Sequence, residues 1–213
     1  MKLYGYWRSS ATYRVRIALH LKQVPFEIVP VNLLASEQLG AGYRHVNPQG
    51  LVPTLVDGAH TIHQSLAILE YLDECYPAPP LLPETPAERA RVRALAALVA
   101  CDVHPLQNTR VGAYLVDVLG VSEEQRATWM RHWMAEGLAA FERLIAHHPA
   151  TGRFCHGEQV TLADALLVPQ MLNARRVGVA LDGFPTLLRI ESECMALDAF
   201  QHGHPTRQPD AVL

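Results

Sequence analysis

The first third of the chain alternates between two kinds of hydrophobic pattern. Short apolar or β-branched runs predict strands, and apolar residues that recur every three or four positions predict helices. The resulting order is β-α-β-α-β-β-α, with strands at 2–7, 26–31, 54–56 and 60–64 and helices that begin near residues 11, 36 and 65. Arg14 and Arg16 fall opposite the apolar positions of the first helix, so we expect both on the surface. Ser65 is the expected N-cap of the third helix.

The rest of the chain has a helical pattern. Five prolines in PAPPLLPETP, residues 77–86, exclude regular structure and predict a linker. A long helix from about residue 87 should break at Pro105. Two capping boxes, S-E-E-Q at Ser122 and T-L-A-D at Thr161, predict the starts of two more helices, and a last helix begins near Pro185. The pattern therefore predicts a small mixed domain followed by an all-helical one.

Composition and charge narrow the classes of protein to consider. Hydrophobic residues make up 49% of the 213 residues and the net charge is −3, which predicts a well-packed soluble protein and favours neither a nucleic-acid nor a membrane partner. The N-terminus lacks a secretory signal and no apolar run is long enough to cross a bilayer, so we expect a cytoplasmic protein. The four cysteines are far apart and are expected to be buried apolar residues. The histidine pairs lack ligand-like partners, so no metal site is expected.

The junction between the first strand and the first helix carries two adjacent serines, in the stretch YWRSSATYRVRIAL. A helix start presents unpaired N–H groups and the positive end of a dipole. One hydroxyl is enough to cap the helix, whereas Ser9, Ser10 and Thr12 supply three. A spare hydroxyl can donate to an anion, and a thiol placed there would have a lowered pKa. A serine nucleophile is disfavoured because neither a GxSxG elbow nor a histidine base is visible.

Two further junctions offer groups to a peptide-like ligand. A cis Val52–Pro53 bond would leave the backbone of Val52 available to an extended peptide, although an ordinary loop proline is the alternative. Gln64 and Ser65 stand at a strand-to-helix turn that suits a carboxylate, although a plain N-cap explains this turn as well. Together the three junctions match a peptide with a thiol in its middle and a carboxylate at its end, and glutathione is such a peptide.

The stretches RSSATYRVRIAL and NPQGLVPTL resemble the zeta class of cytosolic glutathione transferases, which includes maleylacetoacetate and maleylpyruvate isomerases. The resemblance extends through DVHPLQN (102–108), TLADALLVPQ (161–170) and HPTRQPD (204–210), and covers nearly the whole chain. It implies an α+β, thioredoxin-like domain at 1–78 that binds glutathione and an all-α domain at 87–213 that contributes the substrate pocket. It also implies a homodimer.

The resemblance assigns roles to positions that match the family's motifs. It implies that Ser9 and Ser10 are catalytic and activate the sulfur of glutathione, with Ser9 the better candidate. Val52 would pair through its backbone with the cysteinyl part, and Gln64 and Ser65 would hold the γ-glutamyl end. The full set of implied glutathione-binding residues is Gln38, Gln49, Val52, Pro53, Gln64, Ser65, His104 and Asn108.

Three positions depart from the family pattern. Ala11 replaces the cysteine that usually follows the serine pair, so any role of that cysteine is absent here. Tyr13 stands where the family usually has tryptophan. Arg110 stands where a small polar residue is expected in maleylacetoacetate isomerases, and this change bears on the choice of substrate.

Arginines supply the remaining clue about the substrate. Arg8 directly precedes the serine pair, Arg110 follows the break at the proline, and Arg176 ends the helix that begins with TLAD. Surface solvation is the alternative for each. A guanidinium group binds a carboxylate through two hydrogen bonds and stays charged at every working pH. With the resemblance, these arginines predict a small acidic substrate.

The expected activity is glutathione-dependent cis–trans isomerisation of maleylacetoacetate or maleylpyruvate to the fumaryl isomer, by thiolate addition, bond rotation and elimination. One alternative is a general zeta-class transferase or glutathione-dependent dehalogenase, against which the arginines argue. Another is a non-enzymatic binding protein, against which the retained glutathione motifs argue. Arg110 favours maleylpyruvate, whereas the overall resemblance favours maleylacetoacetate.

Overall fold

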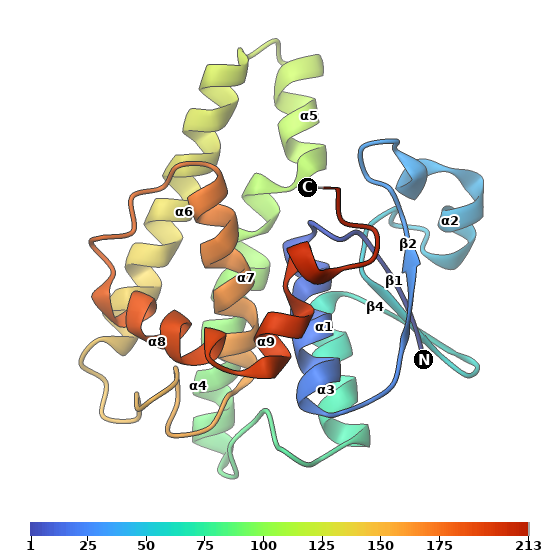
Figure 1. Cartoon of the computed structure of the whole chain (residues 1–213). Coiled ribbons are helices and arrows are strands. Elements are labelled where there is room, and N and C mark those ends of the chain that lie inside the picture. Colours follow the sequence, from blue (N-terminus) through green and yellow to red (C-terminus); the bar gives the residue numbers. More distant parts are fainter. Residues whose placement is uncertain (213) are drawn as a thin grey trace. The chain divides into compact units, whose positions relative to one another are not determined.

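The short apolar runs of the first third form one four-stranded sheet in the computed structural model, which describes residues 1–212 (Figure 1). The sheet order is β2-β1-β3-β4, with β1 parallel to β2 and antiparallel to β3. The strands are β1 (Lys2–Gly5), β2 (Glu27–Pro30), β3 (Thr54–Asp57) and β4 (His60–His63). β3 and β4 form a hairpin whose turn contains Gly58 at a φ of 56°, a conformation that glycine adopts without a steric penalty. The predicted order of strands and helices along the chain, β-α-β-α-β-β-α, is confirmed.

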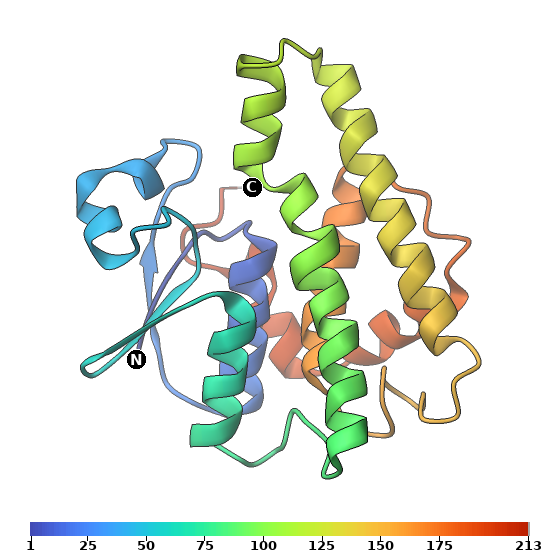
Figure 2. The ribbon, with the colours of Figure 1, turned by 180° about the vertical axis from the view of Figure 1, so that it is seen from behind.

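Helices cover both faces of this sheet. They are α1 (Ser10–Leu21), α2 (Ala41–Val46) and α3 (Ser65–Cys75), with a 3₁₀ turn, η1 (Glu37–Leu39), before α2. α1 and α3 pack together on one face and α2 lies on the other (Figures 1 and 2). Leu3 and Leu55 of the sheet are fully buried, as are Ile17 of α1 and Leu69 of α3. This apolar layer fixes the ends of the strands and helices that carry the candidate site.

The C-terminal tail packs with the N-terminal elements, which the sequence-based division at 87–213 does not anticipate. The chain forms two units: residues 1–81 with the tail from residue 195, and residues 82–194. α9 (Asp198–Gly203) and a 3₁₀ turn, η4 (Pro205–Arg207), belong to this tail, and α9 contacts α1. Tyr13 Oη donates to the carbonyl of Phe200 at 2.7 Å, and the N–H of Trp7 donates to Asp210 Oδ2 at 3.1 Å. Tail groups thus satisfy buried donors that α1 and its N-terminal turn could not pair alone.

Arg14 and Arg16 are buried, so the surface positions predicted for them are wrong. Each is only 1% exposed. Arg14 donates to Ser65 Oγ at 3.1 Å, and Arg16 donates to the carbonyl of Trp7 at 3.0 Å. Burial lowers the pKa of Arg16 to about 10, and the charge of Asp210 opposes this shift. The apolar pattern of α1 could not reveal their burial, because α3 and the tail cover the helix from additional sides.

The second unit is built from helices, as predicted. They are α4 (Pro86–Ala97), α5 (Thr109–Asp117), α6 (Glu123–Ile145), α7 (Leu162–Arg176) and α8 (Pro185–Met195). The break at Pro105 is confirmed: a 3₁₀ turn, η3 (Pro105–Gln107), precedes α5. A π-helical segment, η2 (Leu98–Val103), comes before it and was not predicted. α7 contacts α4 and α6 and is buried along most of its length.

Both predicted capping boxes are present, and they differ in burial. The box at Ser122 is exposed. At the start of α7, Asp164 is fully buried and accepts hydrogen bonds from the N–H of Cys155 at 2.8 Å, the N–H of Thr161 at 2.8 Å and the hydroxyl of Thr161 at 2.9 Å. Burial raises the pKa of Asp164, while these hydrogen bonds act in the opposite direction. Asp164 therefore ties the loop before α7 to the helix.

The cysteine prediction is half right. Cys155 and Cys194 are buried, but Cys75 and Cys101 are exposed. Within residues 1–212, no three His, Cys, Asp or Glu side chains are grouped so that they could hold a metal ion. In the same part of the chain, no helix is both long and apolar enough to cross a membrane.

Candidate functional site

Ser9 caps α1 and keeps a hydrogen to donate. Its Oγ accepts from the N–H of Thr12 at 3.2 Å, and its own N–H is bonded to the carbonyl of Tyr6. A hydroxyl that accepts one hydrogen bond still carries its own donor hydrogen. The first turn of α1 itself contains no acidic residue, and the nearby carboxylate of Asp210 accepts a hydrogen bond from the N–H of Trp7, so the N–H groups of the helix start keep the positive end of the helix dipole. The turn can therefore stabilise an anion.

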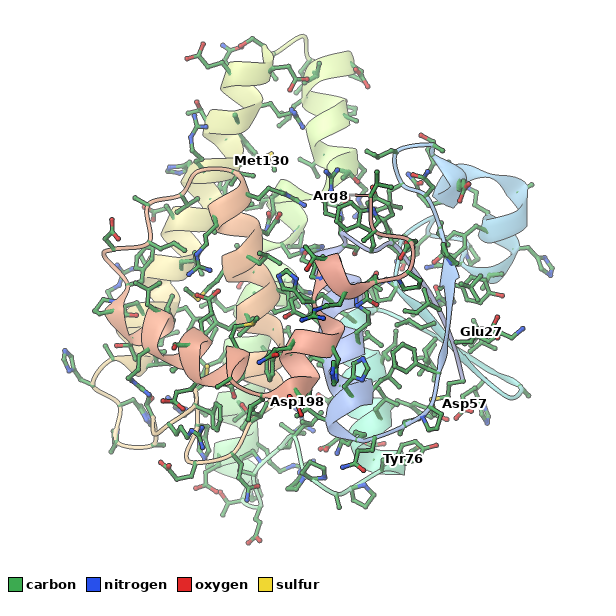
Figure 3. The ribbon with its side chains drawn as sticks, viewed as in Figure 1. Arg8, Glu27, Asp57, Tyr76, Met130 and Asp198 are labelled. Atoms are coloured by element: carbon green, nitrogen blue, oxygen red, sulfur yellow. The ribbon has the colours of Figure 1, made fainter. Side chains whose placement is uncertain are left out.

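Arg8 lies in the same turn and is exposed (Figure 3). Its guanidinium carbon is 5.7 Å from the centre of the Trp7 ring, a distance typical of a cation–π contact. Trp7 is in turn anchored by its N–H bond to Asp210. Ser10, the first residue of α1, is half-buried. The turn from Trp7 to Ser10 thus carries a cation and two hydroxyls in consecutive positions.

The loop before β3 presents the backbone of Val52. The Val52–Pro53 bond is cis, as predicted. The carbonyl of Leu51 accepts hydrogen bonds from Tyr43 Oη and Asn47 Nδ2, both at 2.7 Å. The N–H and C=O of Val52, in contrast, have no hydrogen-bond partner among residues 1–212. Tyr43 and Asn47 therefore fix the loop while the backbone of Val52 stays available to a ligand.

The start of α3 differs from its prediction, because Gln64 and not Ser65 occupies the N-cap. Gln64 has a φ of 69° and makes no capping hydrogen bond with its side chain. A non-glycine residue in this left-handed region costs on the order of 1 kcal/mol and is typical of ligand sites. Its Nε2 donates to Gln49 Oε1 at 2.8 Å, which links this turn to the loop that carries Val52. The N–H groups at the start of α3 can therefore face an anion.

Ser65 is buried at the first position of α3, with Arg14 behind it. Arg14 donates to Ser65 Oγ at 3.1 Å, so the serine hydrogen is directed to another acceptor. A buried cation beside a helix N-terminus adds to its positive potential. Arg14 is a contributor that sequence reasoning missed, since only its contact with Ser65 reveals it.

Gln38 lies in η1, close to the loop that carries Gln49. Its Oε1 is buried and has no hydrogen-bond partner within residues 1–212. Gly50, at a φ of 62°, lets the two segments approach, because a Cβ there would lie 3.0 Å from the backbone oxygen of Gln38. An unsatisfied buried oxygen is costly, which fits an acceptor reserved for a ligand donor.

The second unit contains the other four candidates. His104 ends η2 and is half-buried. Asn108 caps α5, and its Oδ1 accepts from the N–H of Arg110 at 3.1 Å. Arg110 is therefore held in the first turn of α5 with an exposed side chain. Arg176 ends α7 and donates to Asn173 Oδ1, so it has a fixed protein partner.

The comparisons agree with this geometry. The N-terminal domain model of glutathione S-transferase matches residues 8–75. The maleylacetoacetate isomerase of Rhizobium meliloti (strain 1021) is 50% identical, with 96% of each chain covered. A holo structure of maleylpyruvate isomerase, described as a bacterial zeta-class glutathione S-transferase, is 45% identical with a TM-score of 0.97 and covers all of both chains. The maleylacetoacetate isomerase of Methylobacterium extorquens AM1, solved with bound malonate and glutathione, is 43% identical with a TM-score of 0.97 over the same full coverage.

The chain belongs to the zeta class of the glutathione transferase family. The predicted fold, an α+β thioredoxin-like part and an all-helical part, is thereby confirmed. The segment 8–75 that matches the glutathione S-transferase model contains every candidate of the first unit, namely Arg8, Ser9, Ser10, Gln38, Gln49, Val52, Pro53, Gln64 and Ser65. His104, Asn108, Arg110 and Arg176 lie in the second unit.

Sequence reasoning on this zeta-class chain missed the residues that support the site. In the first unit these are Arg14, Tyr43 and Asn47, which fix Ser65 and the loop before β3. In the second unit they are Gln107, Gln170 and Asn173, whose amides are linked by hydrogen bonds. Buried amides and cations in apolar helices are a weak signal for such support, because a buried polar group needs a partner but the sequence does not show which one.

Proposed function

We propose that the chain is a glutathione-dependent cis–trans isomerase that converts maleylacetoacetate or maleylpyruvate to the fumaryl isomer. The observation that carries the proposal is the turn at the start of α1, where Ser9 retains a donor hydrogen beside the exposed cation of Arg8. The names of the full-length relatives, isomerases of maleyl substrates, support it. The first unit would bind glutathione, and the second would contribute to substrate binding.

The residues of the first unit fit glutathione chemically. Val52 offers a free N–H and C=O to the cysteinyl backbone. Gln64 and Ser65, with the start of α3, suit the carboxylate of the γ-glutamyl end, and the unpaired Oε1 of Gln38 suits a donor such as an ammonium or amide group. Gln49 and, from the second unit, His104 and Asn108 complete the proposed binding set. Bound glutathione would supply a thiolate that adds reversibly to the maleyl double bond, so that the bond can rotate before the thiolate leaves.

The chain's own residues would then act by charge and position. Ser9, with Ser10 as a second donor, would stabilise the sulfur anion at the positive end of α1. Arg8, Arg110 and Arg176 would bind the substrate carboxylates and the negative charge that develops on the conjugated carbonyl oxygen. These steps need no high-pKa general base. They require a stabilised anion and fixed cations.

An absorbance assay with both maleyl substrates tests the proposal. Turnover is expected with glutathione and is not expected without it or with S-methylglutathione, which has no thiol. Conversion of an α-halo acid with no isomerisation of either maleyl substrate would replace the proposal with the dehalogenase alternative. Absence of any glutathione-dependent chemistry, with retention on glutathione resin, would favour a binding protein.

We further propose that the protein is a cytoplasmic homodimer. This proposal rests on membership of the zeta class. Analytical ultracentrifugation should give a mass close to twice the 23.6 kDa of one chain. A monomer at micromolar concentration would contradict the dimer.

A further inference from the structure

Four side chains of the second unit form one continuous chain of hydrogen bonds. Arg176 donates to Asn173 Oδ1, and Asn173 Nδ2 donates to Gln107 Oε1. Gln107 Nε2 then donates to Gln170 Oε1 at 2.7 Å. The three amides are buried, with exposures of 8% for Asn173, 6% for Gln107 and 0% for Gln170. Arg176, at the other end of this row of hydrogen bonds, is exposed. The row therefore runs from the surface into the core.

The guanidinium group sets the direction of every bond in this chain. Arginine can only donate, so the oxygen of Asn173 must face it and the nitrogen of Asn173 must face inward. The same constraint passes to Gln107 and then to Gln170. The last nitrogen, Gln170 Nε2, is buried without a partner within residues 1–212. An unsatisfied buried donor destabilises the fold, so stability alone does not account for a row of three buried amides at this place.

This row of hydrogen bonds also joins the two candidate substrate-binding segments of the second unit. Gln107 is the last residue of η3 and directly precedes Asn108, which caps α5 through the N–H of Arg110. Arg176 and Asn173 lie in the last turn of α7. The bond between Gln107 and Asn173 therefore ties the start of α5 to the end of α7.

The neighbouring arginine, Arg175, has a different kind of hydrogen-bond partner. Arg175 makes two contacts with the carboxylate of Glu191, and this partner raises the pKa of Arg175. Asn173 is neutral, so its bond to Arg176 orients the guanidinium group without adding a negative charge. A hydrogen bond from a neutral amide does not itself compete with a ligand carboxylate, as the carboxylate of Glu191 does at Arg175.

We propose that Asn173 and Gln107 are positioning residues that hold the guanidinium group of Arg176 for recognition of a substrate carboxylate. The inference rests on the proposed isomerase function and names the device by which the second unit would bind the acidic substrate. Holding the arginine in place before binding reduces the side-chain entropy that is lost when the carboxylate binds.

The test uses two substitutions of Asn173. Asn173→Leu breaks the row of hydrogen bonds, and Asn173→Asp keeps an acceptor for Arg176 but places a negative charge beside it. Each variant is made in the wild-type protein and in Arg176→Ala. For the maleyl substrate, each is expected to raise KM about tenfold in the wild-type protein, the effect of roughly one charge-assisted hydrogen bond. KM for glutathione should change less than twofold. When added to Arg176→Ala, each Asn173 substitution should change the KM for the substrate by less than twofold relative to Arg176→Ala alone. The guanidinium group that Asn173 positions is then already absent.

A purely structural role makes different predictions. It predicts the same loss in both backgrounds, or equal rises in KM for substrate and glutathione, and either result would overturn the inference. Arg175→Ala is the matched control, since it breaks a contact at the same helix end. It should lower the melting temperature and leave substrate KM within twofold. If Asn173→Leu does not fold, Asn173→Asp, which keeps the size and the acceptor, decides the test.

Calorimetry with malonate, a dicarboxylate that cannot isomerise, separates this inference from the proposed function. Malonate should bind the wild-type protein about tenfold more tightly than either Asn173 variant. If the wild-type protein isomerises neither maleyl substrate, the proposed function fails, yet malonate binding still decides the role of Asn173. If malonate binds the wild-type protein and both variants equally, the inference fails even when isomerisation is observed.

Discussion

The two units of the chain hold their candidate residues in different ways. In the first unit the groups sit at the ends of strands and helices, as Ser9, Val52 and Gln64 do. Their positions follow from the backbone of each turn. In the second unit Arg110 and Arg176 are long side chains, and a buried amide chain leads to Arg176. A substitution in the first unit should therefore act mainly where it is made, whereas a buried substitution in the second can act at a distance.

The units also differ in how they handle positive charge. In the first unit Arg14 and Arg16 are buried and donate to a hydroxyl or carbonyl oxygen. In the second, Arg175 is paired with a carboxylate and Arg176 donates to an amide. Buried cations are fixed by the groups packed around them, while exposed ones must be oriented by partners. The following changes test this contrast.

The largest expected effect is on the stability of the second unit. Asp164→Ala leaves the N–H groups of Cys155 and Thr161 unsatisfied in the core and should reduce the free energy of unfolding by about 3 kcal/mol. Ser122→Ala removes the exposed capping box of α6 and should cost only about 1 kcal/mol. Urea unfolding monitored by circular dichroism measures both. Equal losses would show that burial of the box at Asp164 adds nothing.

The second effect concerns substrate affinity. Arg8→Ala should raise KM for the maleyl substrate about 30-fold, because a charge-assisted carboxylate contact contributes roughly 2 kcal/mol. The KM for glutathione should change less than threefold. The substrate KM of Arg8→Lys should lie between those of the wild-type protein and Arg8→Ala, since lysine keeps the charge but lacks the planar guanidinium group. Steady-state kinetics with each ligand varied in turn gives these values. Equal rises in both KM values would assign Arg8 to glutathione or to the fold.

The third effect concerns the sulfur anion. Ser9→Ala and Ser9→Gly both remove the hydroxyl donor and should lower kcat at least about tenfold. Glycine caps a helix nearly as well as serine, whereas alanine costs about 1 kcal/mol, so the two variants should differ in melting temperature but not in kcat. Ultraviolet absorbance of bound thiolate against pH should show a raised thiol pKa in both. A larger kcat loss in Ser9→Ala than in Ser9→Gly would mean that capping, and not donation, is the role of Ser9.

Local signals in the sequence predicted much of the first unit and less of the second. Turn residues and capping boxes determine structure within a few positions, so the succession of strands and helices along the chain, the cis bond at Pro53 and the helix starts at Ser122 and Thr161 are predicted correctly. Contacts between distant segments could not be read in this way. Arg16 needs the carbonyl of Gly203, far along the chain, and Asn173 needs Gln107. Such partners depend on which distant segments pack together, and helical periodicity does not show this.

The smallest expected effect is a pH dependence that belongs to the first unit. His20 of α1 lies with its ring centre 5.4 Å from Phe26 and 5.6 Å from His202 of the tail. Burial, His202 and Arg16 lower the pKa of His20 below its ordinary 6.5. Below about pH 6.5 the unfolded chain therefore takes up a proton that the folded chain binds only at lower pH, so the free energy of unfolding should fall as the pH falls through this window. The effect should be small because His20 is only half-buried and solvent screens it.

His20→Phe should flatten the decline in melting temperature between pH 7.5 and 5.5, whereas His60→Phe, at an exposed position of β4, should not. An unchanged slope in His20→Phe would show that protonation of His20 does not govern the attachment of the tail to α1.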